Sequence, residues 1–100
     1  PVSHTIRMPV KGLNASGTFY ISFLNLPRHR IYAPQQVQLL KDGVAYKTID
    51  LKPEDSPEKG EMMKATVPAD LNGTEQLSIK ISCLKKPGTQ MGIDEIAFIP

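Results

Sequence analysis

The sequence contains no tryptophan, one cysteine and no long apolar run, and its basic and acidic side chains nearly balance. The single thiol of Cys83 excludes an internal disulfide framework. No apolar run approaches the ~18 residues that a membrane-spanning helix needs. Twelve basic against ten acidic residues give a net charge of +2, which is too little for a surface that binds a phosphate backbone. Nucleic acids and membranes are therefore not predicted partners.

The chain nevertheless has enough apolar residues for one folded core. Of its 100 residues, 40% are apolar and 22% are charged, and domains cluster near this length. We therefore expect a single domain over residues 1–100 and exclude a disordered tail and a collagen-like fibre. The chain opens on Pro1 with no targeting pattern and closes without a tail. We expect it to be one domain of a larger protein.

Apolar and polar residues alternate along most of the chain, which is the pattern of β-strands. In residues 17–26 the alternation places Phe19, Ile21 and Phe23 on one face and Tyr20, Ser22 and Leu24 on the other, as expected of a central strand. The other predicted strands are residues 6–10, 37–41, 44–51, 61–67, 76–84 and 91–99. The predicted core is Phe19, Ile21, Phe23, Val37, Leu39, Leu77, Ile79, Ile81, Ile93 and Phe98, and Cys83 is expected to be a buried thiol.

Two local details and the fold class follow from the same pattern. Asp42-Gly43 tolerates the positive φ angles of a type I′ turn, so it predicts a tight hairpin. The alternation changes phase between Ile93 and Ile96, which predicts a β-bulge at Asp94-Glu95. Nine prolines and seven glycines punctuate the chain, and no segment has a helical stripe. The predicted fold is all-β, a two-sheet antiparallel β-sandwich with little or no helix.

Four segments follow one another in a recognisable order. A Gly-Thr-Phe-Tyr-Ile-Ser-Phe strand at 17–23 precedes the hairpin at 37–46, the segment 67–81 and a closing strand at 92–98 with an Ile-Asp-x-Ile pattern. In this order they resemble galactose-binding-like jelly-roll domains, many of which are carbohydrate-binding modules appended to glycoside hydrolases. The resemblance implies a jelly-roll sandwich with an accessory function in carbohydrate binding.

The binding site is predicted where the longer loops meet. If consecutive strands reverse direction, the loops at 26–35, 52–60 and 84–91 share one end of the sandwich, and those at 11–16, 42–43 and 68–74 share the other. Loops on a rigid sandwich are common binding sites. The predicted ligand-binding residues are Arg28, His29, Arg30, Tyr32, Lys85 and Gln90.

Within this loop cluster the two types of side chain have different expected roles. Tyr32 offers a ring face, and Arg28 or Arg30 offers paired donors for hydroxyls or a carboxylate. The alternative is a structural one, in which Ile31 and Tyr32 plug the end of the sandwich. A sugar-binding domain is expected to expose Tyr32 or Tyr20, whereas a bracing domain is expected to expose a broader apolar patch.

The sequence shows no recognisable catalytic or metal-binding motif. Ser3-His4 and Asp94-Glu95 are neighbours along strands, so their side chains point to opposite faces, and the two histidines lack the spacing of zinc ligands. We predict neither an enzyme nor a cofactor. A structural calcium ion stays open, because related jelly rolls carry one, although no Asp-x-Asp-x-Asp-Gly loop is present.

Two segments match the acceptor pattern for N-glycosylation. They are Asn14-Ala15-Ser16 and Asn72-Gly73-Thr74, both in loops at the end opposite the predicted site. The alternative interpretation is that Asn and Gly are here simply turn residues.

The prediction for function is non-catalytic binding of a carbohydrate or another polar ligand. We expect an accessory module of a larger extracellular protein or glycoside hydrolase, secreted, periplasmic or at a cell surface. The alternative is a structural or protein-interaction β-sandwich that braces neighbouring domains of the parent chain and has no small ligand.

Overall fold

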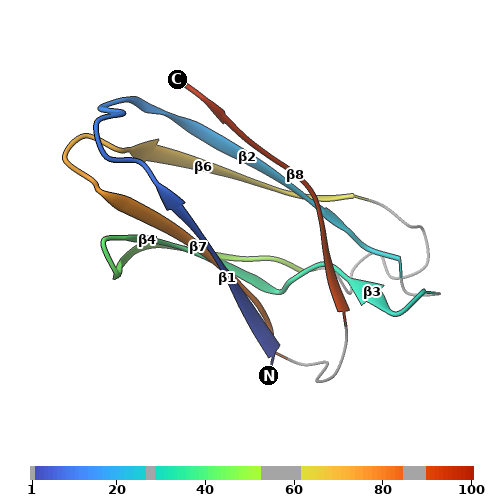
Figure 1. Cartoon of the computed structure of the whole chain (residues 1–100). Helices are drawn as coiled ribbons and strands as arrows, with labels where there is room; N and C mark the ends of the chain where they lie inside the picture. Colours follow the sequence, from blue (N-terminus) through green and yellow to red (C-terminus); the bar gives the residue numbers. More distant parts are fainter. Residues whose placement is uncertain (1, 27–28, 53–61, 85–89) are drawn as a thin grey trace.

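In the computed structural model, two four-stranded β-sheets pack face to face (Figure 1). The structure describes residues 2–26, 29–52, 62–84 and 90–100. Their strands are β1 (Val2–Pro9), β2 (Ser16–Leu24), β3 (Ile31–Tyr32), β4 (Gln36–Lys41), β5 (Val44–Asp50), β6 (Met63–Asp70), β7 (Gln76–Cys83) and β8 (Gln90–Ile99). One sheet has the order β1-β7-β4-β5 and the other the order β3-β8-β2-β6. The prediction of an all-β sandwich is confirmed.

Strand pairing is antiparallel except at β3. This two-residue strand, which the sequence did not predict, runs parallel to the start of β8. β2 lies between β6 and β8, as expected for a central strand. The described residues contain no α-helix.

The core lies between the sheets and is built from alternate residues of the strands. Eight of the ten predicted core residues are buried, from Phe19 to Ile81, and Cys83 is 1% exposed. Ile93 and Phe98 are half-buried and pack against this core, with the rings of Phe98 and Phe19 4.8 Å apart. The difference for these two residues comes from the edge position of β8, which beyond Met91 has no described neighbour on its outer side.

Both predicted local features are confirmed. Asp42 and Gly43 have φ angles of 49° and 84°, as a type I′ turn requires. In β8, Glu95 pairs with Ser22 and Ile93 pairs with the next residue of β2, so Asp94 is the extra residue of a bulge. The bulge explains the change of phase in the sequence. It also interrupts the alternation at Asp94 and Glu95, which are both exposed, so the expectation that they point to opposite faces is wrong.

A second bulge, which the sequence did not predict, lies in the edge strand β5. Leu39 pairs with Lys47 and Leu40 pairs with Ala45, so Tyr46 is the extra residue. A bulge and a charged residue on an edge strand are features that disfavour edge-to-edge pairing between chains.

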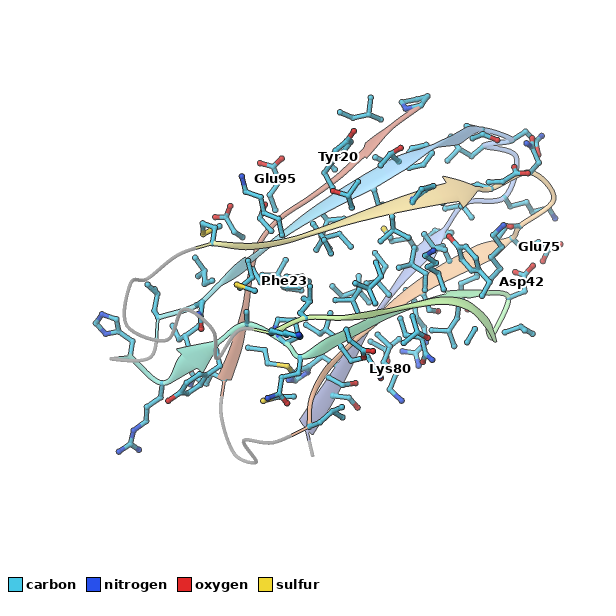
Figure 2. The ribbon with its side chains drawn as sticks, turned by 180° about the vertical axis from the view of Figure 1, so that it is seen from behind. Tyr20, Phe23, Asp42, Glu75, Lys80 and Glu95 are labelled. Atoms are coloured by element: carbon cyan, nitrogen blue, oxygen red, sulfur yellow. The ribbon has the colours of Figure 1, made fainter. Side chains whose placement is uncertain are left out.

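The described parts of the loops lie at the two ends of the sandwich, as the alternation of strand direction predicts. At one end, which we call the turn end, the Gly73 amide donates to Asn14 Oδ1 at 3.4 Å and the Glu75 amide donates to Asp42 Oδ1 at 3.1 Å. Figure 2 shows Asp42 and Glu75 together there. At the other end, the loop end, the Gln90 amide donates to the carbonyl of Arg30 at 3.3 Å.

Candidate functional site

The outer face of β6, β2 and β8 carries an exposed aromatic ring at its centre. Because side chains alternate along a strand, β2 turns Phe19 and Ile21 into the core and Tyr20 outward. Phe19 and Ile21 are 3% and 1% exposed, whereas Tyr20 is 45% exposed. Figure 2 shows Tyr20 and Glu95 outside this sheet, with Phe23 between the two sheets.

The residues paired directly with Tyr20 are short. Thr66 of β6 and Ala97 of β8 are its partners in the two ladders, and directly paired residues share a face of the sheet. Neither side chain is long enough to form a wall beside the tyrosine ring. The ring is therefore approachable from the direction of both neighbouring strands.

The next row toward the loop end carries charges of both signs. Ser22 pairs with Lys64 on one side and with Glu95 on the other, and both charged residues are exposed. Two strand spacings separate β6 from β8, about 10 Å. This row therefore presents an ammonium group, a hydroxyl and a carboxylate in a line beside the ring.

The row toward the turn end is more apolar. Thr18 pairs with Pro68 and with Ile99, and Ile99 is 57% exposed. We call the three rows together the Tyr20 face, which consists of Thr18, Tyr20, Ser22, Lys64, Thr66, Pro68, Glu95, Ala97 and Ile99. It combines an aromatic platform with donors and acceptors on one side and apolar carbon on the other.

The three tyrosines differ in how much ring they offer to a ligand. Tyr32 of β3 is half-buried. Tyr46 is 37% exposed, but the Nζ of Lys41 lies 4.5 Å from its ring centroid, and partial burial raises the pKa of its hydroxyl. No aromatic or cationic side chain stacks on Tyr20 within the part of the chain that the structure describes. Tyr20 is accordingly the best-placed ring.

The predicted loop site is described only in part. Arg28 and Lys85 lie outside the described residues. His29 and Arg30 are exposed. They precede Ile31, whose carbonyl accepts a hydrogen bond from the Leu26 amide at 2.7 Å. Arg30 occupies the left-handed region with φ 57°.

Some of the loop residues fit the interpretation as a ligand site, and others fit the interpretation as a structural plug. Gln90 is exposed and its backbone meets that of Arg30, so these two predicted residues share the loop end. Ile31 and Tyr32 are half-buried, and Ile31 packs over Gly92, where a Cβ would lie 2.8 Å from Ile31 Cγ2. The exposed residues suit a ligand site and the half-buried ones suit a plug, so the loop site stays a prediction.

The carboxylate of Asp70 at the turn end is engaged by its neighbours. Its Oδ1 accepts hydrogen bonds from the Asn72 amide at 3.0 Å, from Asn72 Nδ2 at 2.6 Å and from Ser16 Oγ at 3.1 Å. These bonds favour the ionised form, so they hold the pKa of Asp70 below its usual value. Asp70 therefore serves the turn that joins β6 to β7.

Both asparagines of the glycosylation patterns also take part in turn hydrogen bonds. Asn72 donates to Asp70, and Asn14, with φ 44°, accepts from the Gly73 amide. The interpretation of these residues as turn formers explains both contacts.

No group of three or more His, Cys, Asp or Glu side chains that could hold a metal ion occurs in residues 2–26, 29–52, 62–84 and 90–100. The hypothesis of a structural calcium ion therefore has no described ligand cluster and stays a prediction. In the same ranges no helix is long and apolar enough to cross a membrane.

The sequence pattern identified Tyr20 as outward-facing but not the residues around it. Lys64 and Thr66 come from β6 and Glu95 and Ala97 from β8, more than 40 residues along the chain from Tyr20. The alternation of apolar and polar residues in each of the three strands shows which residues face outward. Only the strand order shows which of these outward-facing residues are neighbours.

Comparison of the chain with known proteins found no matching family model, curated protein or solved structure. The resemblance to galactose-binding-like jelly rolls therefore stays an expectation from the sequence.

Proposed function

We propose that this domain is a non-catalytic carbohydrate-binding module whose ligand lies on the Tyr20 face. The observation that carries the proposal is the 45% exposed ring of Tyr20 at the centre of three paired strands. The proposal includes the galactose-binding-like family and a place in a larger extracellular protein, both of which rest on the resemblance found in the sequence.

The chemistry of the Tyr20 face matches that of a sugar. A pyranose ring has an apolar face of C–H groups, which packs on an aromatic ring, and a rim of hydroxyls, which need donors and acceptors. Tyr20 provides the first contact, and Lys64 and Glu95 provide the second from the adjacent row. Hydrogen bonds that involve charged groups are the stronger ones. An apolar platform with a few polar groups is the usual composition of a small-molecule site.

The arrangement of carboxylates supports binding rather than catalysis. A glycoside hydrolase uses two carboxyl groups that flank the scissile bond. The exposed carboxylates beside Tyr20 are Glu95 and its bulge neighbour Asp94, which both come from β8 and so lie on one side of Tyr20. At the turn end, Asp70 already accepts three hydrogen bonds. This supports the non-catalytic form of the proposal.

The bracing alternative finds less support in the described surface. Large exposed apolar side chains other than the tyrosines and Ile99 are divided between the two ends, with Leu13 and Val44 at the turn end and Met62 and Leu84 at the loop end. A bracing domain is expected to gather such residues into one patch, whereas scattered exposed residues are ordinary.

The test is a glycan array with the wild-type domain and two variants. Tyr20→Ala is expected to weaken binding to the selected glycan at least tenfold, about 1.4 kcal/mol. Tyr46→Ala is the matched control, because Tyr46 is also an exposed tyrosine but belongs to the other sheet. It is expected to bind within twofold of the wild type.

Two results would count against the proposal in different ways. If no glycan binds the wild-type domain, carbohydrate binding is refuted and bracing becomes the leading function. If Tyr20→Ala binds normally while a folded Arg28→Ala/Arg30→Ala double variant or Tyr32→Ala loses binding, the ligand lies at the loop end and the assignment to the Tyr20 face is wrong.

A further inference from the structure

We infer that the Tyr20 face takes an interior segment of a neutral glycan chain, rather than an acidic glycan or the end of a chain. This inference rests on the proposed function, since it names the class of carbohydrate for the same face. It is carried by three features of the face, namely its charges, the short side chains around Tyr20 and its width.

The charges beside the ring include no excess of cations. Lys64 and Glu95 flank the same residue, Ser22, on opposite sides, and the exposed Asp94 adjoins Glu95 in the bulge. An acidic sugar that approaches Lys64 therefore also approaches Glu95 in the same row of the sheet. Its attraction to the ammonium group of Lys64 is offset by its repulsion from the carboxylate of Glu95. A neutral sugar hydroxyl meets no such conflict, because it donates to a carboxylate and accepts from an ammonium group equally well.

Among the described residues, short side chains flank Tyr20 on four sides. Thr66 and Ala97 lie beside the ring across the strands, and Thr18 and Ser22 lie beside it along the strand. All four side chains are short, and the longer side chains occupy the diagonal positions. Recognition of a chain end requires a wall that blocks the next sugar, and these short neighbours leave room for the chain to continue on both sides of the ring.

The width of the face exceeds one sugar. Lys64 and Glu95 start from strands about 10 Å apart, which is longer than a single pyranose ring. A ligand that extends beyond the sugar on Tyr20 can therefore make contacts along this row that a single sugar cannot. Affinity is consequently expected to rise with the number of linked sugars.

The test uses native gels cast with defined polysaccharides, followed by calorimetry. Hydroxyethylcellulose, galactomannan and mixed-linkage β-glucan are the neutral probes, and polygalacturonate, alginate and dextran sulfate are the acidic ones. We expect at least one neutral polymer to retard the wild type and Tyr20→Ala to abolish that retardation. For oligosaccharides cut from this polymer, affinity is expected to rise at least tenfold between one and four sugars.

A charge-reversal variant tests the balance of the face directly. Glu95→Lys leaves two cations beside Ser22, so acidic polymers are expected to retard this variant at low salt and to release it at high salt. Asp50→Lys, on β5 of the other sheet, changes the net charge by the same amount and is the control. It is expected to behave as the wild type.

The outcomes separate this inference from the proposed function. If only acidic polymers retard the wild type, if single sugars bind as tightly as tetrasaccharides, or if Asp50→Lys gains acidic ligands as strongly as Glu95→Lys, the inference is overturned and carbohydrate binding stands. If none of the neutral or acidic polymers retards the wild type, the proposed function fails and the inference falls with it.

Discussion

Phe23 and Tyr20 lie three residues apart on β2 and face opposite sides of the sheet, so they provide a direct test of the face assignment. Phe23 is 0% exposed and is the largest fully buried side chain, whereas Tyr20 is 45% exposed. The two aromatic residues lie on the same strand and are nearly the same size. A difference in stability between their alanine variants therefore reports the difference in burial between the two side chains.

The expected loss at Phe23 is large. A buried aromatic side chain removes about 150–250 Å² from water, which at about 25 cal/mol per Å² corresponds to about 4–6 kcal/mol. Alanine retains the Cβ and the surrounding core relaxes in part, so Phe23→Ala is expected to cost about 3–5 kcal/mol. Tyr20→Ala is expected to cost about 1 kcal/mol or less, because truncation of this outward-facing side chain leaves the core unchanged.

Urea unfolding of both variants measures these losses as the free energy of unfolding. Domains of this size are stable by only about 5–15 kcal/mol, so Phe23→Leu, expected to cost about 1–2 kcal/mol, gives a folded variant even if Phe23→Ala unfolds. Equal denaturant dependence in all proteins shows that the native and unfolded states are comparable. A loss below about 1 kcal/mol for Phe23→Ala, or equal losses for both alanine variants, would refute the assignment of the two faces.

The remaining predictions concern the backbone and the turn end. Gly17→Ala is expected to cost more than Gly12→Ala in urea unfolding, because a Cβ at Gly17 meets the carbonyl oxygen of Ile99, whereas at Gly12 it meets open space and costs only the positive φ, about 1–2 kcal/mol. Asp42→Ala is expected to lose about 1–3 kcal/mol, because the carboxylate accepts from the amides of Glu75 at 3.1 Å and Gln76 at 2.8 Å. Asp42→Asn keeps an acceptor oxygen and a tolerance for positive φ, so a loss equal to that of alanine would contradict this role. The pKa of Asp70 is lower in the folded state than its ordinary value, so its contribution to stability is complete above a pH of about 4 and is lost as the pH falls through the folded pKa. Asp70→Asn is expected to flatten this acid part of a plot of Tm against pH, and an unchanged plot would show that the hydrogen bonds to Asp70 do not favour its ionised form.

The fold was predictable from the sequence because its signals are local. The alternation of Phe19, Ile21 and Phe23 with outward-facing residues needs only the period of a strand, and the Asp42-Gly43 turn needs only two residues with positive φ. The bulge at Asp94 was visible as a change of phase. β3 was not predictable, because a two-residue strand has no period and forms only through its contact with β8.

The candidate site was predictable only in part, because its residues meet through long-range pairing. The direction of the strands correctly grouped the described parts of the loops, and His29, Arg30 and Gln90 share the loop end. Most of the predicted loops at 52–60 and 84–91 lies outside the described residues. The Tyr20 face depends on the order β8-β2-β6. No local pattern indicates that order, so Lys64 and Glu95 could not be assigned to one row before the ladders were known.

Tyrosine is a good strand former, so its position on β2 has a structural explanation that competes with the functional one. Pairing of Tyr20 with Thr66 and Ala97 stabilises a sheet by about 0.2–1 kcal/mol per pair, and the full range of β-propensity is about 1 kcal/mol. A residue selected only for the sheet would therefore show a small loss of stability on truncation and no other effect. A residue that carries a ligand shows the same small loss together with at least a tenfold loss of binding, about 1.4 kcal/mol. The two explanations predict the same unfolding curve for Tyr20→Ala, so only the binding measurement on that variant distinguishes them.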